Sequence, residues 1–257
     1  GDVLTQGVGH VGGLDTFGQF YTFKHDLNAV VGLAFHVGRQ AVGAHGQHAL
    51  IAFAAHFGFA VGLHFLRVGV AVAGDDGRWR NRSLVFDGTG AIRARYDKIH
   101  LFDVDIPDGI TYRESATVTP GHDLPPVVDV PELCRIGLSI CYDVRFPELY
   151  RHLVGAGAEL IMVPAAFTAY TGKDHWQILL QARAIENTAY LLAPAQTGLH
   201  YGRRQSHGHA LVIDPWGTVL ADAGVSQGVA VAPVDPSHLQ RVRGQMPSLR
   251  HRRPALF

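Results

Sequence analysis

Residues 137–150, Gly-Leu-Ser-Ile-Cys-Tyr-Asp-Val-Arg-Phe-Pro-Glu-Leu-Tyr, contain a change of hydrophobic period on which the fold depends. Apolar residues alternate with other residues before Cys141, which predicts a β-strand that ends at this cysteine. Pro147 suits the first turn of a helix, where its missing N–H costs little, and apolar residues follow it at helical spacing. The stretch therefore predicts a strand, a turn that presents Cys141, and a helix.

The segments around this stretch also alternate between strand and helix patterns. Residues 160–163 form a short apolar run that is typical of a strand buried on both faces. Two hairpin patterns, one helix pattern and one further apolar run lie at residues 83–96, 210–221, 176–184 and 190–193. This alternation predicts a layered α/β fold. Because a chain of 257 residues with 47% apolar residues can bury one large core, we expect a single domain over residues 1–257.

The charge balance favours a small-molecule enzyme. The chain has 22 basic and 22 acidic residues, which gives no long-range field that would attract nucleic acid or an anionic membrane. Cys134 and Cys141 are the only two cysteines, too few for a disulfide framework in a chain of this length. The first residues lack the basic region and apolar run of a secretion signal. We therefore expect a cytoplasmic protein without a nucleic-acid or membrane partner.

The stretch from Ala49 to Gly74 is apolar enough to be compared with a membrane span. A transmembrane helix needs about 20 consecutive apolar residues. His56, His64 and Arg67 interrupt this stretch, and small residues surround each apolar cluster. The pattern favours buried helix and strand over a membrane segment.

The first 74 residues differ in composition from the rest of the chain. They hold seven of the 16 histidines, and no glutamate occurs before Glu114. Helices usually carry glutamate on their solvated faces and in their first turns. Residues 1–74 are therefore atypical for a domain of this class.

Two residues carry the candidate chemistry, and each has a structural alternative. A nucleophile at a strand-to-helix turn is exposed and lies near backbone N–H groups, which suits Cys141; the alternative is a buried inert cysteine, which describes Cys134 well. Lys98 stands among aromatic and aliphatic residues, and a partly desolvated ammonium near a cysteine would favour the thiolate and hold an oxyanion. By residue type alone, Lys98 is more often a solvated lysine whose stem covers apolar neighbours.

Four ordered motifs resemble the nitrilase, or carbon-nitrogen hydrolase, superfamily. They are Tyr96-Asp-Lys-Ile-His-Leu-Phe-Asp103, Tyr112-Arg-Glu-Ser115, Ile140-Cys-Tyr-Asp-Val-Arg-Phe-Pro-Glu148 and Ala182-Arg-Ala-Ile-Glu-Asn187. The later segments, such as Asp214-Pro-Trp-Gly217, look most like the Nit branch, also called the deaminated glutathione amidase branch. The resemblance covers about residues 75–257.

The resemblance implies an αββα sandwich that becomes four-layered when two subunits pair, so a homodimer or higher homo-oligomer is expected. It implies a Glu-Lys-Cys catalytic set, of which Lys98 and Cys141 match two members, and Glu114 matches a further glutamate near the site. Cys141 would form a thioester with a small linear amide, for which a deaminated-glutathione-like compound is the suggested substrate, and release ammonia. Lys98 and the Tyr142 N–H would lie at the oxyanion, and Phe167 would line the pocket. No cofactor and no metal is expected.

The first catalytic glutamate of the family has no counterpart in this sequence. Asp26 is the only acid near the expected distance before Lys98, and the residues around it do not resemble the family motif, so the role is not assigned to it. Two explanations remain open: a catalytically impaired nitrilase-fold binding protein, or a first segment of about 70 residues that derives from a shifted or misjoined reading frame. An ω-amidase of short keto-acid amides is the closest enzymatic alternative.

Overall fold

The computed structural model describes residues 71–256 with their side chains, except 108–109, 132–133 and 201–203. Before residue 71 it describes only the backbone path of five strands, the last of which ends at residue 73. The first four strands are β1 (Gly7–Val11), β2 (Leu14–Gly18), β3 (Val30–Val37) and β4 (Ala55–Val61). Asp26 lies outside the described residues. The structure therefore does not test a role for this residue.

One six-stranded sheet has the order β10-β11-β12-β13-β16-β17. Its strands are β10 (Val127–Val130), β11 (Cys134–Leu138), β12 (Leu160–Met162), β13 (Tyr190–Ala193), β16 (Leu211–Ile213) and β17 (Val219–Asp222). The three central strands β11, β12 and β13 run parallel, and the outer strands pair antiparallel. The carboxyl ends of the parallel strands therefore meet at one edge of the sheet.

A second six-stranded sheet is antiparallel throughout and has the order β18-β3-β4-β5-β6-β7. The strands not yet located are β5 (Phe65–Ala73), β6 (Trp79–Asp87), β7 (Ile92–Asp97) and β18 (Ala230–Pro233). Two short hairpins stand apart from the large sheets: β8 (Asp103–Asp105) with β9 (Thr111–Arg113), and β14 (Thr197–His200) with β15 (Arg204–His207).

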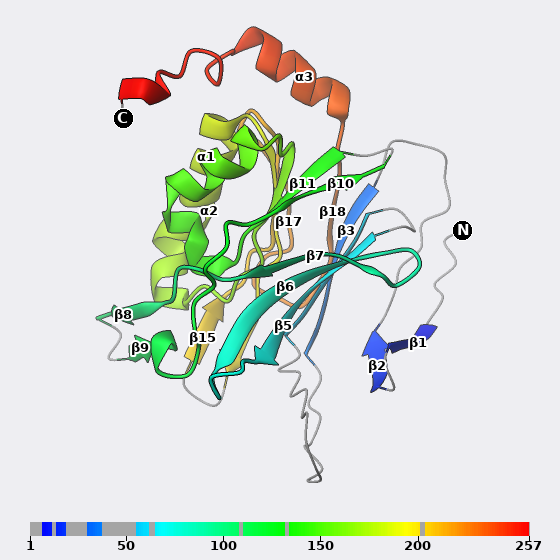
Figure 1. Cartoon of the computed structure of the whole chain (residues 1–257), viewed down its shortest axis with the longest axis vertical. Coiled ribbons are helices and arrows are strands. Elements are labelled where there is room, and N and C mark those ends of the chain that lie inside the picture. Colours follow the sequence, from blue (N-terminus) through cyan, green and yellow to red (C-terminus); the bar gives the residue numbers. More distant parts are fainter. Residues whose placement is uncertain are drawn as a thin grey trace.

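Two helices cover the first sheet. They are α1 (Pro147–Gly155) and α2 (Ala169–Asn187), and Figure 1 shows both on the side of β10 and β11 that faces away from the second sheet. Helix α3 (Pro236–Gln245) lies beyond the end of the sheets, followed by the carboxyl-terminal segment with the short helix η3 (Pro254–Leu256). Two further short helices, η1 (Glu114–Ala116) and η2 (Cys141–Arg145), lie in the connections.

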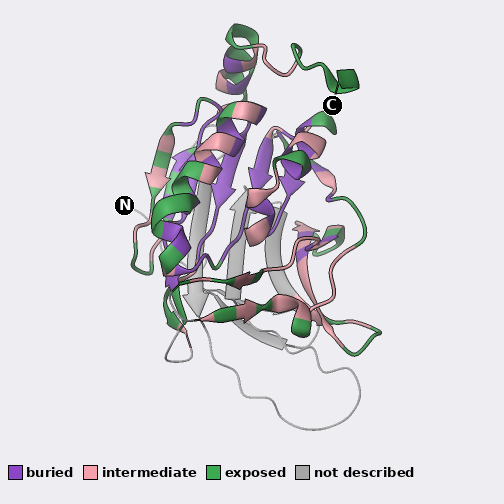
Figure 2. Ribbon diagram, turned by 90° about the vertical axis from the view of Figure 1, so that its left-hand side faces the viewer, coloured by how far each residue is buried: buried purple, intermediate pink, exposed green. Residues whose placement is uncertain are grey.

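The hydrophobic core lies between the helices and the first sheet and between the two sheets. The central strands are its most buried part, as Figure 2 shows by their colour. Leu138, Ile161, Leu191 and Val212 are fully buried, one from each of four neighbouring strands. Continuous apolar runs thus became strands buried on both faces, as the sequence predicted for residues 160–163.

The predicted α/β class is confirmed, as are the strand, turn and helix around Cys141. Three layers of the αββα sandwich can be assigned: the helices α1 and α2 and the two sheets. Among the described residues no helix covers the outer face of the second sheet. Within Ala49–Gly74 the structure forms β4 and β5, and no helix in the described part of the chain is long and apolar enough to cross a membrane.

Candidate active site

Cys141 lies where β11 gives way to the short helix η2, at the carboxyl edge of the parallel strands. Its backbone φ of 50° is left-handed, a conformation that costs an L-residue about 1–3 kcal/mol and that clusters at functional sites. The Cys141 N–H donates to the carbonyl of Pro164 at 2.8 Å, which anchors the turn to the segment after β12. The turn thus presents a half-buried thiol at the sheet edge.

The surroundings of the Cys141 thiol act on its pKa in opposite directions. Burial raises the pKa above its ordinary value and is the dominant effect, and the charges of Glu114 and Asp143 add to it. The ammonium of Lys98 and a backbone hydrogen bond from Ala166 lower the pKa. The Lys98 effect that the sequence suggested is therefore present, but burial outweighs it. Burial therefore favours the protonated form of the thiol.

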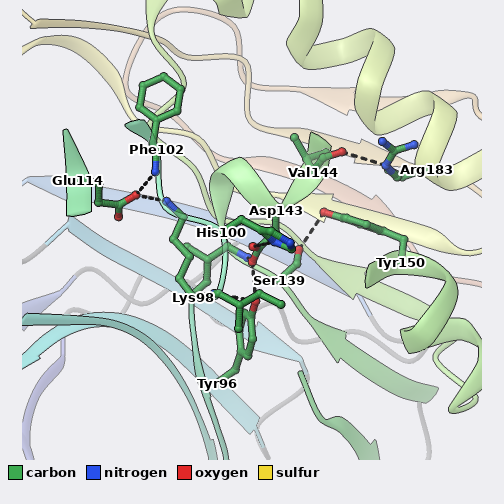
Figure 3. A network of polar contacts seen from close by, with 12 residues as sticks. Tyr96, Lys98, His100, Phe102, Glu114, Ser139, Asp143, Val144, Tyr150 and Arg183 are labelled. Atoms are coloured by element: carbon green, nitrogen blue, oxygen red, sulfur yellow. Dashed lines mark hydrogen bonds and ion pairs between the residues drawn. The ribbon is translucent and has the colours of Figure 1, made fainter. Parts of the chain in front are cut away.

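Lys98 follows β7 and points into the protein. Its side chain is 2% exposed, and its Nζ forms an ion pair with Glu114 Oε2 (Figure 3). Its backbone N–H donates to the carbonyl of Asn81 on β6 at 2.9 Å, which fixes the chain at this point. The interpretation of Lys98 as a solvated surface lysine is therefore wrong, because the folded chain buries it beside a carboxylate.

Glu114 begins the short helix η1 and is held by three donors. Besides the Lys98 ammonium, the Phe102 N–H donates to Oε2 at 2.7 Å, and the Asn81 side-chain amide donates to Oε1 at 3.3 Å. Removing one partner from such a largely buried ion pair typically costs about 3–5 kcal/mol. Glu114 therefore holds the Lys98 side chain in position.

Aromatic side chains surround the cysteine turn. The rings of Tyr142 and Phe102 lie 5.0 Å apart, and the Phe167 ring packs on Trp176 of α2 at 4.8 Å. The guanidinium of Arg145 lies over both Tyr142, at 5.8 Å, and Phe167, at 5.3 Å. Tyr142, which follows the cysteine, and Phe167 therefore both contact the Arg145 guanidinium.

Sequence reasoning missed several residues that contact this site. Asp143 is fully buried and bonds Tyr96 and His100 (Figure 3), and Arg145 lies 3.3 Å from His175 through its Nη2 atom. All but His175 lie inside the motifs quoted for the family resemblance. Their contacts join segments that are 30 to 47 residues apart, so a local sequence pattern could not predict these contacts. Within the described part of the chain, no group of three or more His, Cys, Asp or Glu side chains could hold a metal ion.

Comparison with known proteins gives one family. The family model described as "Carbon-nitrogen hydrolase" matches residues 48–244, so its match begins upstream of the motifs. A deaminated glutathione amidase from Synechocystis is 61% identical over 181 residues, which cover 70% of this chain and 66% of that protein. The chain thus spans about two thirds of the length of this curated relative.

Solved structures agree with this assignment. The Caenorhabditis elegans NitFhit protein superposes with a TM-score of 0.67 at 43% identity, covering 74% of this chain and 48% of that one. An amidase from Nesterenkonia superposes at 0.57 and 29% identity, covering 70% of this chain and 66% of that one. In that structure, of a glutamate-to-leucine variant, the acetamide moiety of fluoroacetamide is covalently added at the active-site cysteine. The chain therefore belongs to the carbon-nitrogen hydrolase family.

Proposed function

We propose that this protein is an amidase that cleaves the carbon–nitrogen bond of a small linear acid amide through a thioester on Cys141. The observation that carries the proposal is the buried Lys98–Glu114 ion pair, which lies close enough to the left-handed cysteine turn for its charges to act on the thiol. Covalent addition at the cysteine of the Nesterenkonia amidase supports the same nucleophile.

The reaction proceeds in two half-reactions. The Cys141 sulfur attacks the amide carbonyl and loses its proton, which passes through the Lys98–Glu114 pair to the leaving amine. The oxyanion is stabilised by the Lys98 ammonium and the Tyr142 N–H, because the Cys141 N–H already donates to Pro164. Water then attacks the thioester, the carboxylic acid departs, and the thiol is restored.

The cations near the site favour a substrate that carries carboxylates. Arg145 lies over the Tyr142 ring next to the nucleophile, where it can bind a carboxylate on the acyl part. A row of rings runs from Tyr142 to Phe102 and Tyr112, with spacings of 5.0 and 5.2 Å. The guanidinium of Arg204 lies 5.2 Å from the Tyr112 ring at the far end of this row. Two separated cations suit a long acid amide better than a short one.

Deaminated glutathione is therefore the favoured substrate, in agreement with the name of the Synechocystis relative. This compound has no primary amide, so hydrolysis of one of its amide bonds releases an amine. The ammonia release expected from the sequence applies only to primary amides, such as the short keto-acid amides of an ω-amidase.

One observation favours a second candidate, a binding protein without turnover. No glutamate precedes Glu114, so the general base that the family resemblance implies has no match. A positioned general base typically contributes about 3–5 kcal/mol to the reduction of the barrier. Glu114 is the carboxylate that would have to supply this contribution, and turnover by the chain decides between the two candidates.

We also propose a homodimer in a reducing, cytoplasmic setting. Ile178 and Ile185 lie two turns apart on α2 and are exposed, and Ile185 packs against the turn that contains Gly217 and the exposed Trp216. An apolar face of this kind favours burial against a second copy. Both cysteines are free thiols, which suits a reducing compartment.

The test is release of amine from deaminated glutathione and of ammonia from a short keto-acid amide, measured with the wild-type chain and with Arg145→Met. We expect release from deaminated glutathione with the higher kcat/KM, and a rise in KM in the variant. Preference for the short amide would assign the ω-amidase activity. No release from a folded sample would assign the binding role.

A further inference from the structure

Asp143 is a buried carboxylate with a complete set of donors. Its side chain is 0% exposed, and the Ile140 N–H and the Tyr96 hydroxyl both donate to Oδ2 at 2.8 Å. His100 Nδ1 donates to Oδ1 at 2.8 Å (Figure 3). These three hydrogen bonds offset the cost of burying the polar side chain. Asp143 is therefore held in a fixed position at the base of the cysteine turn.

The positions of these partners in the sequence are the informative feature. Tyr96 and His100 stand two residues before and two residues after Lys98, and Asp143 stands two residues after Cys141. One carboxylate thus joins both flanks of the lysine to the turn that carries the nucleophile. The Ile140 bond closes that turn around Cys141 itself.

We propose that Asp143 is a positioning residue, which fixes the Lys98 ammonium relative to the Cys141 sulfur through Tyr96 and His100. We call this arrangement the Asp143 clamp. The proposal rests on the proposed function, because the distance between Lys98 and Cys141 matters only if the two residues act together in catalysis. Asp143 touches neither reacting atom in this scheme and acts through the two residues it joins.

The clamp is also tied to the helical layer. The His100 ring stacks on Phe146 with centroids 3.6 Å apart and an interplanar angle of 5°, and Phe146 immediately precedes the first residue of α1. On the other side, Arg183 of α2 donates from Nε to the Val144 carbonyl at 2.9 Å. The turn that holds Asp143 therefore cannot shift without breaking contacts to both helices. Lys98 is connected to this turn through the Asp143 clamp.

The test compares two buried tyrosines. Tyr96→Phe removes one donor of the clamp and keeps the ring, whereas Tyr150→Phe removes an equally buried hydroxyl that is bonded to Ser139 instead. For Tyr96→Phe we expect kcat to fall about 10- to 100-fold, because small misplacements of catalytic groups have effects of this size. KM and the melting temperature should match those of the Tyr150→Phe control.

A second measurement reports on the lysine–cysteine spacing without turnover. The folded protein is labelled with iodoacetamide at different pH values, and the label on Cys141 is quantified in the peptide that contains it. The pH dependence gives the midpoint of thiol ionisation, to which the Lys98, Glu114 and Asp143 charges all contribute. A loosened clamp moves Lys98 away and shifts the midpoint to higher pH in Tyr96→Phe. Equal midpoints and equal kcat in Tyr96→Phe and Tyr150→Phe would overturn the clamp.

His100 variants provide an independent comparison. His100→Asn keeps a donor close to the position of Nδ1, and His100→Phe keeps the stacking on Phe146 without a donor. The wild-type labelling midpoint should be retained in the first variant and shifted upward in the second. Labelling midpoints test the clamp even if the wild-type chain proves inactive on amides, so failure of the clamp and failure of the proposed function are distinguishable.

Discussion

Lys98 shows how far a single residue type can be interpreted from sequence. Lysines are usually solvated, and only the surrounding motif suggested otherwise. The structure buries Lys98 against Glu114 because β6 and the start of η1 bring Asn81 and Glu114 to it. The family resemblance predicted that Cys141, Lys98 and Glu114 share one site, but the contacts of Asp143 with its partners could not be predicted. Their bonds depend on how distant segments meet.

Lys98→Met should reduce kcat about 100- to 1,000-fold, the range measured when one oxyanion donor is removed. The variant should also unfold at lower temperature, because Glu114 loses its cation in a largely buried position. Amide hydrolysis and thermal melting measure the two effects. Lys173→Met is the matched control, since its ammonium is exposed on α2. Equal loss in both variants would exclude a specific role for Lys98.

The Cys141 thiol should titrate above the ordinary thiol pKa of about 8.5, because burial outweighs the opposing effect of Lys98. A raised pKa means that the thiolate is scarce at neutral pH and appears as the pH rises. Iodoacetamide labelling of Cys141 should therefore be slow at pH 7 and accelerate beyond pH 9. This differs from the rapid labelling near neutral pH that an activated thiol would show. A labelling rate that is already maximal at pH 7.5 contradicts this expectation.

At the scale of elements, strands and helices with a clear hydrophobic periodicity could be predicted from the sequence, whereas the short hairpins could not. The strand before Cys141, helix α1 and the hairpins β6–β7 and β16–β17 follow local patterns. The β14–β15 hairpin has four-residue strands that carry little pattern of their own. It is positioned by tertiary contacts instead, since the His207 N–H donates to the Phe167 carbonyl at 2.9 Å.

Thr168 caps helix α2, whose Trp176 packs on the Phe167 ring. Its hydroxyl accepts a hydrogen bond from the Thr171 N–H. Thr168→Ala should lower the free energy of unfolding by about 1 kcal/mol, whereas Thr168→Ser should nearly retain it, because serine caps equally well. Urea denaturation of the two variants measures the difference. Equal destabilisation by both would mean that the cap contributes nothing.

At the scale of the whole molecule, composition flagged residues 1–74 but could not say what they build. In the structure, β3, β4 and β5 lie between β18 and β6 and complete the second sheet. Without these strands, β18 and β6 would be left with open edges. The position of β3 depends on its pairing with β18, which begins more than 190 residues later in the chain, and sequence patterns do not predict such pairing.

The apolar face of α2 predicts a specific effect on assembly. Ile178→Lys replaces an apolar side chain that is 67% exposed, so the monomer fold should be unaffected while the proposed dimer dissociates. Light scattering coupled to gel filtration measures the mass. Leu124→Lys, at a residue 61% exposed in another part of the molecule, should leave the dimer intact. A wild-type chain that is monomeric, or an Ile178→Lys variant that remains dimeric, contradicts the assignment of this face.

The most direct test of the central claim is the rate of deaminated glutathione hydrolysis by the wild-type chain and by Cys141→Ala, with equal folding verified by circular dichroism. The account predicts release of amine by the wild-type chain and none above background by the variant, because the thioester cannot form without the sulfur. Equal rates in the two proteins, or no hydrolysis by a folded wild-type chain, would contradict it.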